Sequence, residues 1–426
     1  MSNVPFGFSP GDPDQNNPGG MPPGFDVGQL GQMLTQLGQM LSQAQSGAGG
    51  PVNYDVAKQM AVQKVAAAGD LQPTAEQHAA VSDAVHLAEL WLDGATSLPA
   101  GARVAKAWSA QEWVEQTLGT WKRLCDPVAE QMSGAWVQAM PEEAKQAAGP
   151  LLAMISQMGG LAFGSQLGSG LGQLATEVLG STEVGLPLGP DAVAALIPAN
   201  VEKFTEGLER PASEVMVYLA AREAAHHRLF VHVPWLRARL LGTVEEYAKG
   251  IKVDTAALEE IAGKLDPSNP AALEEAMSGG LLEPQTTPEQ KAALVRLETL
   301  LALVEGWVDE VVAQAVGERL PGAAAMRETL RRRRASGGPA EQTFATLIGL
   351  ELRPRRLRDA ANLWALLTER HGADARDAVW AHPDLMPTSE DLDEPLDFAD
   401  RLGKGALDGI DPIEELEKTQ RRDDEA

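Results

Sequence analysis

The sequence predicts a mainly helical protein, and three observations lead to this fold class. Between about residues 52 and 380, apolar residues recur at spacings of three and four, as on one face of a helix. Several of these segments begin at a proline, which the first turn of a helix tolerates because its missing N–H has no partner there. Segments with a strand pattern are few. The 426 residues, 44% hydrophobic, allow one large or two ordinary domains with a sizeable core.

Eight segments have the helical pattern, and two have a strand pattern. The helices are expected at residues 74–92, 104–118, 141–157, 211–231, 234–250, 288–316, 321–334 and 355–371. The strand candidates are residues 183–188 and 193–198, which Gly189 and Pro190 separate. We therefore expect at most a small β hairpin or edge sheet beside the helices.

Composition divides the chain into three parts. Residues 1–51 are rich in Pro and Gly and predict a disordered arm, with a short amphipathic helix between Leu30 and Leu41. Residues 52–388 form the predicted helical domain. Residues 389–426 hold fourteen acidic and five basic residues, which predicts an acidic, flexible tail.

Residues 146–176 contain no charged side chain, so a membrane span has to be considered. Polar residues interrupt this stretch. Gly160, Gly164, Gly168 and Gly172 recur every four residues, which places them on one helix face where another backbone can approach closely. This pattern favours a buried, tightly packed helix over a membrane span.

Net charge argues against two classes of partner. The formal charge of −25 disfavours nucleic acid and anionic membranes as main partners. Residues 318–358 are an exception, with ten arginines against four glutamates. No aromatic residues alternate with these arginines, so we interpret them as a solvated face that the acidic tail could cover. The sequence does not indicate an oligomeric state.

Cysteine content and the first residues bear on the compartment. Cys125 is the only cysteine, which excludes an intramolecular disulfide and a cysteine-based zinc site. Residues 1–23 have neither a basic residue nor an apolar run, so no secretory signal is expected. A cytoplasmic location is the prediction.

The segment from Arg222 to His227 resembles the His-Glu-x-x-His helix of zinc peptidases, with arginine in place of the first histidine. In that motif two histidines one turn apart hold the metal, and the glutamate between them activates a bound water. Here Glu223 and His226 lie in the middle of an apolar stripe. Burying both costs several kcal/mol unless they are paired or bind a metal.

The predicted helix 288–316 has an almost unbroken core stripe with three carboxylates along its edge. These are Glu298, Glu305 and Asp309, at spacings of seven and four. Like charges this close need a cation among them or raised pKa values. Gly306 leaves room for another helix or a ligand to come near. The sequence does not show whether Glu298 belongs to the same site as the other two.

These motifs occur together with three further blocks, at residues 230–236, 350–360 and 382–388. On this combination the chain resembles a zincin-like metallopeptidase family of bacteria, chiefly actinobacteria, over about residues 50–390. The resemblance implies a zincin-like core, zinc, and hydrolysis of peptides. Carried over, Glu223 would be the general base, His226 and Glu305 would be zinc ligands, and Asp309 would orient a ligand histidine.

Arg222 departs from the family pattern, because a guanidinium has no lone pair for a metal and would repel Zn²⁺. One interpretation keeps zinc through a shifted ligand set that includes His227 or His232. However, His227 lies about 100° round the helix from His226. A carboxylate-bridged di-iron site would need a second Glu-x-x-His, which the sequence lacks.

The other interpretation lets Arg222 replace the metal electrostatically, in a buried ion pair with Glu223, Glu305 or Asp309. The protein would then keep the peptidase fold without zinc-dependent hydrolysis. It could serve as a non-catalytic protein that binds a peptide or protein segment, or as a regulator. Zinc is therefore the cofactor that the resemblance implies, and Arg222 leaves open whether this chain binds it.

Overall fold

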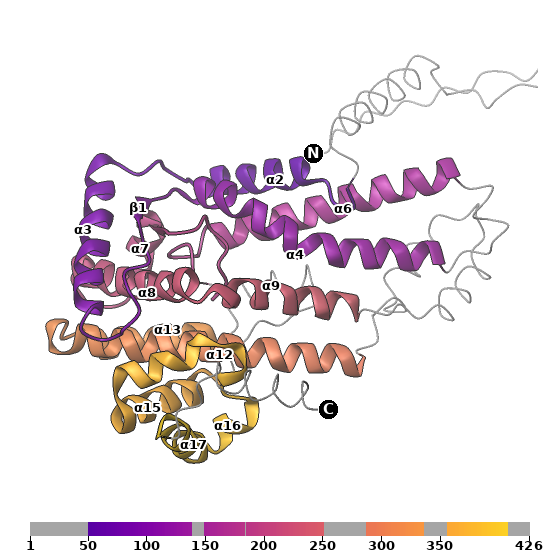
Figure 1. The fold of residues 1–426 in the computed structure, drawn as a ribbon. Helices are drawn as coiled ribbons and strands as arrows, with labels where there is room; N and C mark the ends of the chain where they lie inside the picture. The colour runs from indigo at the N-terminus through magenta and orange to yellow at the C-terminus, as the bar shows by residue number, and fades with distance from the viewer. Residues whose placement is uncertain (1–49, 139–148, 184, 251–286, 336–355, 408–426) are drawn as a thin grey trace, which may run out of the picture. The chain divides into compact units, whose positions relative to one another are not determined.

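The computed structural model describes residues 50–138, 149–183, 185–250, 287–335 and 356–407, and they form a mainly helical unit (Figure 1). The predicted fold class is confirmed. The predicted arm and its short helix lie outside the described residues. The helices are α2 (Tyr54–Ala67), α3 (Ala75–Leu92), α4 (Ala110–Gln138), α6 (Gly149–Ala175), α7 (Pro198–Thr205), α8 (Ala212–His232), α9 (Pro234–Lys249), α12 (Pro288–Val316), α13 (Ala323–Ala335), α15 (Leu357–Ala378), α16 (Ser389–Asp393) and α17 (Pro395–Leu407).

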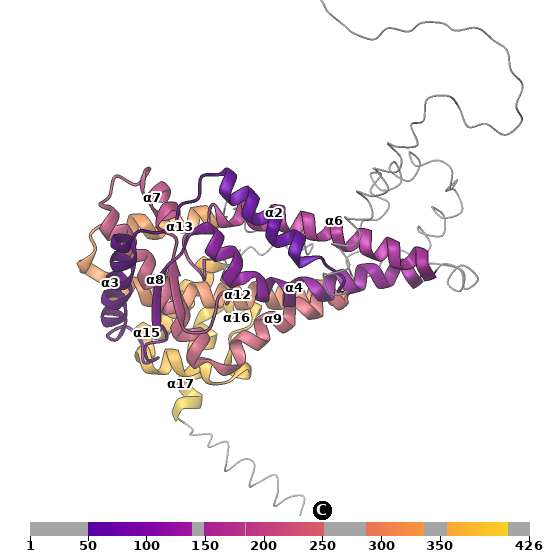
Figure 2. The ribbon, with the colours of Figure 1, turned by 90° about the horizontal axis from the view of Figure 1, so that it is seen from above.

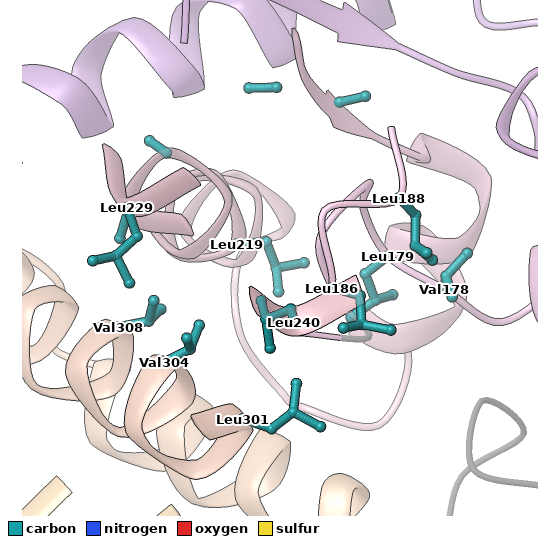
Figure 3. Close-up of a cluster of buried hydrophobic side chains, with 14 of the residues drawn as sticks. Val178, Leu179, Leu186, Leu188, Leu219, Leu229, Leu240, Leu301, Val304 and Val308 are labelled. Atoms are coloured by element: carbon teal, nitrogen blue, oxygen red, sulfur yellow. The ribbon is translucent and has the colours of Figure 1, made fainter. Parts of the chain in front are cut away.

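Helix α12 runs through the core and packs against α8, α9 and α15. It begins after Thr287, whose hydroxyl accepts from the backbone N–H of Gln290 while the Gln290 side chain accepts from the N–H of Thr287. Its apolar stripe meets leucines and valines of α8, α9 and the segment 178–188. Figure 3 labels these side chains: Val178, Leu179, Leu186, Leu188, Leu219, Leu229, Leu240, Leu301, Val304 and Val308.

The uncharged stretch forms α6, which packs against α2 and α4 (Figures 1 and 2). Its four regularly spaced glycines face the segment Pro51–Lys64. A Cβ on Gly160 would lie 3.3 Å from the carbonyl oxygen of Pro51, and one on Gly172 would lie 3.0 Å from that of Ala61. The close packing that the glycine spacing predicts is present. The described helices, α6 included, contain no candidate membrane span.

A second close approach joins α12 to α15, one residue after Glu305. A Cβ on Gly306 would lie 2.7 Å from the Cβ of Ala360 and 2.7 Å from the backbone nitrogen of Ala361. The indole N–H of Trp364 also donates to the carbonyl oxygen of Leu303 at 2.9 Å. The position of Glu305 therefore depends on contact between two helix backbones.

Replacing Gly306 with alanine should lower the free energy of unfolding by about 1–3 kcal/mol, because α15 must move away. Alanine's better helix propensity, worth roughly 1 kcal/mol, offsets only part of this loss. Gly242 of α9 provides the control, since a Cβ there would meet nothing within 4 Å. We expect Gly242→Ala to raise the stability by about 0.5–1 kcal/mol. Urea denaturation measures both, and a gain in both variants would contradict the close contact.

The small sheet differs from the predicted hairpin. β1 (Val104–Ala107) and β2 (Val193–Leu196) pair in parallel, with Val104 opposite Val193. The second strand candidate is therefore correct. Its expected partner 183–188 is wrong, because Gly185 has φ +79°, which interrupts an extended strand. Residues 179–181 instead lie antiparallel beside β2, where the N–H of Ser181 donates to the carbonyl oxygen of Ala195 at 3.0 Å.

Two further boundaries need correction. The expected helix 104–118 starts six residues later, at Ala110, because residues 104–107 form β1. Residues 389–407, assigned by composition to the acidic tail, form α16 and α17, which pack on α15. Leu392, Phe398 and Ala399 are buried there, which explains why this segment is ordered. The remainder of the predicted tail lies outside the described residues.

Candidate functional site

Helix α8 carries the Arg222–His227 segment through the interior of the protein. Arg228, which follows it directly, is fully buried and binds Glu89 at 2.6 Å and Asp93 at 2.6 Å. This pair of contacts fixes α8 against α3. Glu223 and His226 are 3% and 2% exposed, as their place in the apolar stripe predicts. They point to different partners, so the two halves of the motif have to be described separately.

Glu305 of α12 is the centre of the first half, and its carboxylate binds two guanidinium groups. Arg222 Nη2 lies 2.7 Å from Oε2, and Arg334 Nη2 lies 2.6 Å from Oε1. His226 Nε2 lies 3.0 Å from the same Oε1. Burial, the largest single influence, would raise the pKa of Glu305. The charges of Arg334, His226 and Arg222 together outweigh it, so the pKa lies well below its usual range.

The orientation of His226 is set by its own helix. Its Nδ1 lies 2.8 Å from the carbonyl oxygen of Arg222, which can only accept, so Nδ1 carries the hydrogen. Nε2 then faces Glu305. Only the ring orientation is that of a metal-binding histidine, because the ionised Glu305 carboxylate acts only as an acceptor toward Nε2. His226 and Glu305, which were expected to be ligands of one zinc ion, lie in direct contact, but Arg334 binds the same carboxylate oxygen.

Glu223 faces the other side of α8, toward β2 and the turn before it. Ser181 Oγ and the backbone N–H of Ala195 donate to Oε1, the latter at 3.2 Å. The backbone N–H and the hydroxyl of Thr182 donate to Oε2, at 3.2 and 2.6 Å. Burial opposes ionisation most strongly, yet the contact with His227 and the hydroxyl donors prevail and lower the pKa of Glu223. Because four donors bind this carboxylate, its position is that of a stabilising hydrogen-bond acceptor and not that of a general base facing a water.

Asp309 binds arginines and not a ligand histidine. Its Oδ2 accepts from Arg327 at 2.5 Å and from Arg331, and Arg222 Nη1 lies 4.0 Å from Oδ1. The family pattern implies that Asp309 orients a ligand histidine, but its partners here are arginines. Asp309 instead draws α13 onto α12.

The alternative ligands lie away from Glu305. His227 Nε2 lies 3.4 Å from Glu223 Oε1, and its side chain leaves the helix about 100° from that of His226. His232 Nε2 lies 3.1 Å from the carbonyl oxygen of Ala100, in an exposed position at the end of α8. Glu298 is half-buried on α12, two turns before Glu305. The shifted zinc set that includes His227 or His232 is therefore not assembled around Glu305.

A small cavity of about 30 Å³ lies beside Glu223 and His226 and is also lined by Arg222 and Arg334. Since one water needs roughly 10–15 Å³ of such space, it has room for about two waters. Leu219 and Leu330 form part of its apolar wall. The cavity therefore has room for water next to the motif residues.

Three residues of the site, Arg327, Arg331 and Arg334, were not predicted. They belong to the arginine-rich segment that we interpreted as a solvated face. Their spacing of four and three places them on one face of α13, which is the signal that could have identified them. Arg334 also donates to the backbone carbonyl of Glu183. These three arginines bind the carboxylates of α12, whereas Arg356 of the same arginine-rich segment binds Asp393 of the predicted tail at 2.5 Å.

The residues present do not fit a zinc ion. Both oxygens of Glu305, the expected carboxylate ligand, are bound by guanidinium groups, which repel a divalent cation. Within the described part of the chain, no group of three or more His, Cys, Asp or Glu side chains is arranged to hold a metal. Asp309 is likewise bound by arginines.

The fold is that of a helical protein in which α8 and α12 carry the two motifs of a metallopeptidase. In the site, arginines bind the Glu305 carboxylate that was expected to hold the metal. The sequence profile of the zincin-like metallopeptidases matches residues 52–399. The chain belongs to this family.

One solved structure is similar in fold. It is that of a protein from Chloroflexus aurantiacus described as a "putative hydrolase with a novel fold". The TM-score is 0.59 and the identity 18%, over 83% of this chain and 99% of that one, so the likeness concerns the fold alone. A search of curated proteins gives no match.

Proposed function

We propose that this protein uses the zincin-like scaffold to bind a peptide or protein segment and does not catalyse zinc-dependent hydrolysis. The observation that carries the proposal is the double occupation of Glu305, by Arg222 on one oxygen and by Arg334 on the other. Zinc binding would require both guanidiniums to leave a carboxylate that is fully buried. Displacing them would leave two partly buried positive charges without their counter-charge, which is unfavourable by several kcal/mol.

The position of Glu223 supports the same conclusion. In a zinc peptidase this residue accepts a proton from the attacking water. Here its two oxygens accept from backbone N–H groups and hydroxyls of residues 181, 182 and 195. It would have to give up these bonds before it could act as a base. For the protein as a whole, a binding or regulatory role remains. This is the alternative that the sequence analysis left open.

Metal analysis of purified protein tests this proposal. We expect wild-type protein loaded with excess zinc and then desalted to keep far less than one zinc per chain. The double variant Arg222→His, Arg334→Gln restores the second histidine and frees Glu305 Oε1. It should keep about one zinc per chain, because two histidines and a carboxylate then converge. Arg222→His alone should gain less, since Arg334 still covers Oε1.

Arg332→His is the matched control, because Arg332 lies on the same helix as Arg334 but is 77% exposed and binds Glu328. It should gain no zinc. Tightly held zinc in the wild type would refute the proposal, and so would peptide hydrolysis that stops when the metal is removed. A double variant that folds but keeps no zinc would show that the arginines are not what prevents binding.

A further inference from the structure

Four arginines surround the two buried carboxylates of α12. Arg327, Arg331 and Arg334 extend from one face of α13, and Arg222 reaches the same place from α8. Glu305 and Asp309, their acceptors, are 0% and 2% exposed. The side chains of the arginines are 13–29% exposed, so solvent reaches the guanidinium side of each pair.

The charges in this cluster do not balance. Four guanidiniums face two carboxylates, which leaves an excess of two positive charges. Tyr218, beside Arg222, stays neutral because burial raises its pKa. Glu310 also acts on Arg327 and Glu328 on Arg331, so the excess applies to the directly paired carboxylates. Glu183, the next carboxylate, is paired with Arg333 at 3.2 Å.

The hydrogen-bonding capacity of the cluster is also only partly used. Each guanidinium carries five N–H bonds. Arg331 donates to Asp309 through Nη2, while its Nε is buried and has no hydrogen-bond partner. A buried donor without a partner is unfavourable, so such groups normally have an acceptor. The Nε of Arg331 is shielded from solvent, so it is the excess charge of the partly exposed guanidiniums that calls for an anion.

We propose that Arg222, Arg327, Arg331 and Arg334 form a binding site for the phosphate group of a small ligand. Arginines that approach from two helices suit a tetrahedral group with several charged oxygens better than a carboxylate, which has two oxygens and one charge. The site lies on the solvent side of the guanidiniums. The inner cavity of about 30 Å³ is too small for a ligand that carries a phosphate group. The inference rests on the proposed function in one respect, that Arg222 and Arg334 stay on Glu305.

Calorimetric titration of inorganic phosphate into the full chain tests the site, with ionic strength held constant by sodium chloride. We expect saturable binding of about one phosphate per chain. Arg331→Gln should weaken it about tenfold, because one charge-assisted hydrogen bond is lost. Arg331→Lys keeps the charge but not the fork of donors, and should fall between the two. Thermal melting of each variant without phosphate shows that it is folded.

Arg332→Gln is the matched control, since Arg332 neighbours Arg331 but is 77% exposed and binds Glu328. Its phosphate affinity should stay within about twofold of the wild type. No saturable binding by the wild type, or an equal loss in the two glutamine variants, would overturn the site. Repeating the titration with EDTA separates the two proposals. If the protein proves to hold zinc but its phosphate binding is unchanged by EDTA, the proposed function is refuted and the phosphate site is not.

Discussion

Glu305→Gln should lower the free energy of unfolding by about 3–5 kcal/mol, because it leaves two guanidiniums without their buried counter-charge. Arg222 and Arg334 lie 2.7 and 2.6 Å from the two carboxylate oxygens. An amide keeps one oxygen as an acceptor but presents N–H hydrogens where the second guanidinium now donates. Urea denaturation at neutral pH, with the melting temperature as a second readout, measures the loss.

The effect should depend on pH in a definite direction. The pKa of Glu305 is lowered in the folded protein relative to the unfolded chain, where glutamate titrates near about 4.3. Its contribution is therefore fully present above that value and is lost as the pH falls toward the lower pKa of the folded state. The difference between the wild type and Glu305→Gln should be constant from about pH 6 to 8 and shrink below about pH 4.

Glu310→Gln is the control on the same helix. Glu310 is half-buried, and its Oε1 accepts from the side chain of Gln314 at 2.8 Å. A glutamine can retain that bond, so the change should stay within about 0.5 kcal/mol. A Glu305→Gln variant as stable as Glu310→Gln would mean that the guanidiniums are not held by this carboxylate. The proposed function would then lose its main support.

The sequence predicted the centre of this site but not its surroundings. Glu223, His226 and Glu305 could be selected because polar groups in an apolar stripe require partners, and the partnership of Arg222 with Glu305 was one of the alternatives considered. The contribution of Arg334 was not predicted, although its acceptor Glu305 is only 29 residues away along the chain. Helical periodicity places a residue on a face but does not indicate which helix that face meets.

The sheet shows a similar limit. β1 and β2 are four residues each, and Val104 pairs with Val193, 89 positions further along the chain. A strand this short has too few residues to show alternation, so residues 104–107 fitted a helical pattern equally well. In contrast, α12 has 29 residues and a capping box at Thr287, and its predicted bounds are confirmed. Length and local capping explain why one element was predictable and the other was not.

The other large effect is expected at Glu223, where glutamine should lower the free energy of unfolding by roughly 2–4 kcal/mol. Each carboxylate oxygen faces a backbone N–H, from Ala195 on Oε1 and from Thr182 on Oε2, both at 3.2 Å. Hydroxyl groups can rotate to accept a hydrogen bond, but these two amides cannot. Whichever way a glutamine side chain turns, its NH₂ group meets an N–H, and a buried donor is left without an acceptor.

Glu214→Gln, in the first turn of the same helix, is the matched control. It should change stability by less than about 1 kcal/mol, since the buried Oε2 of Glu214 has no hydrogen bond to lose and a favourable interaction with the helix dipole is reduced. Because the pKa of Glu223 is lowered in the folded state, the effect of Glu223→Gln should be largest above about pH 4.3 and diminish in acid. Urea denaturation at pH 7 and pH 4 measures both variants. If Glu223 served only as a catalytic base, this substitution would leave stability unchanged or improve it. A Glu223→Gln variant as stable as the wild type would therefore contradict the structural role and restore the catalytic one.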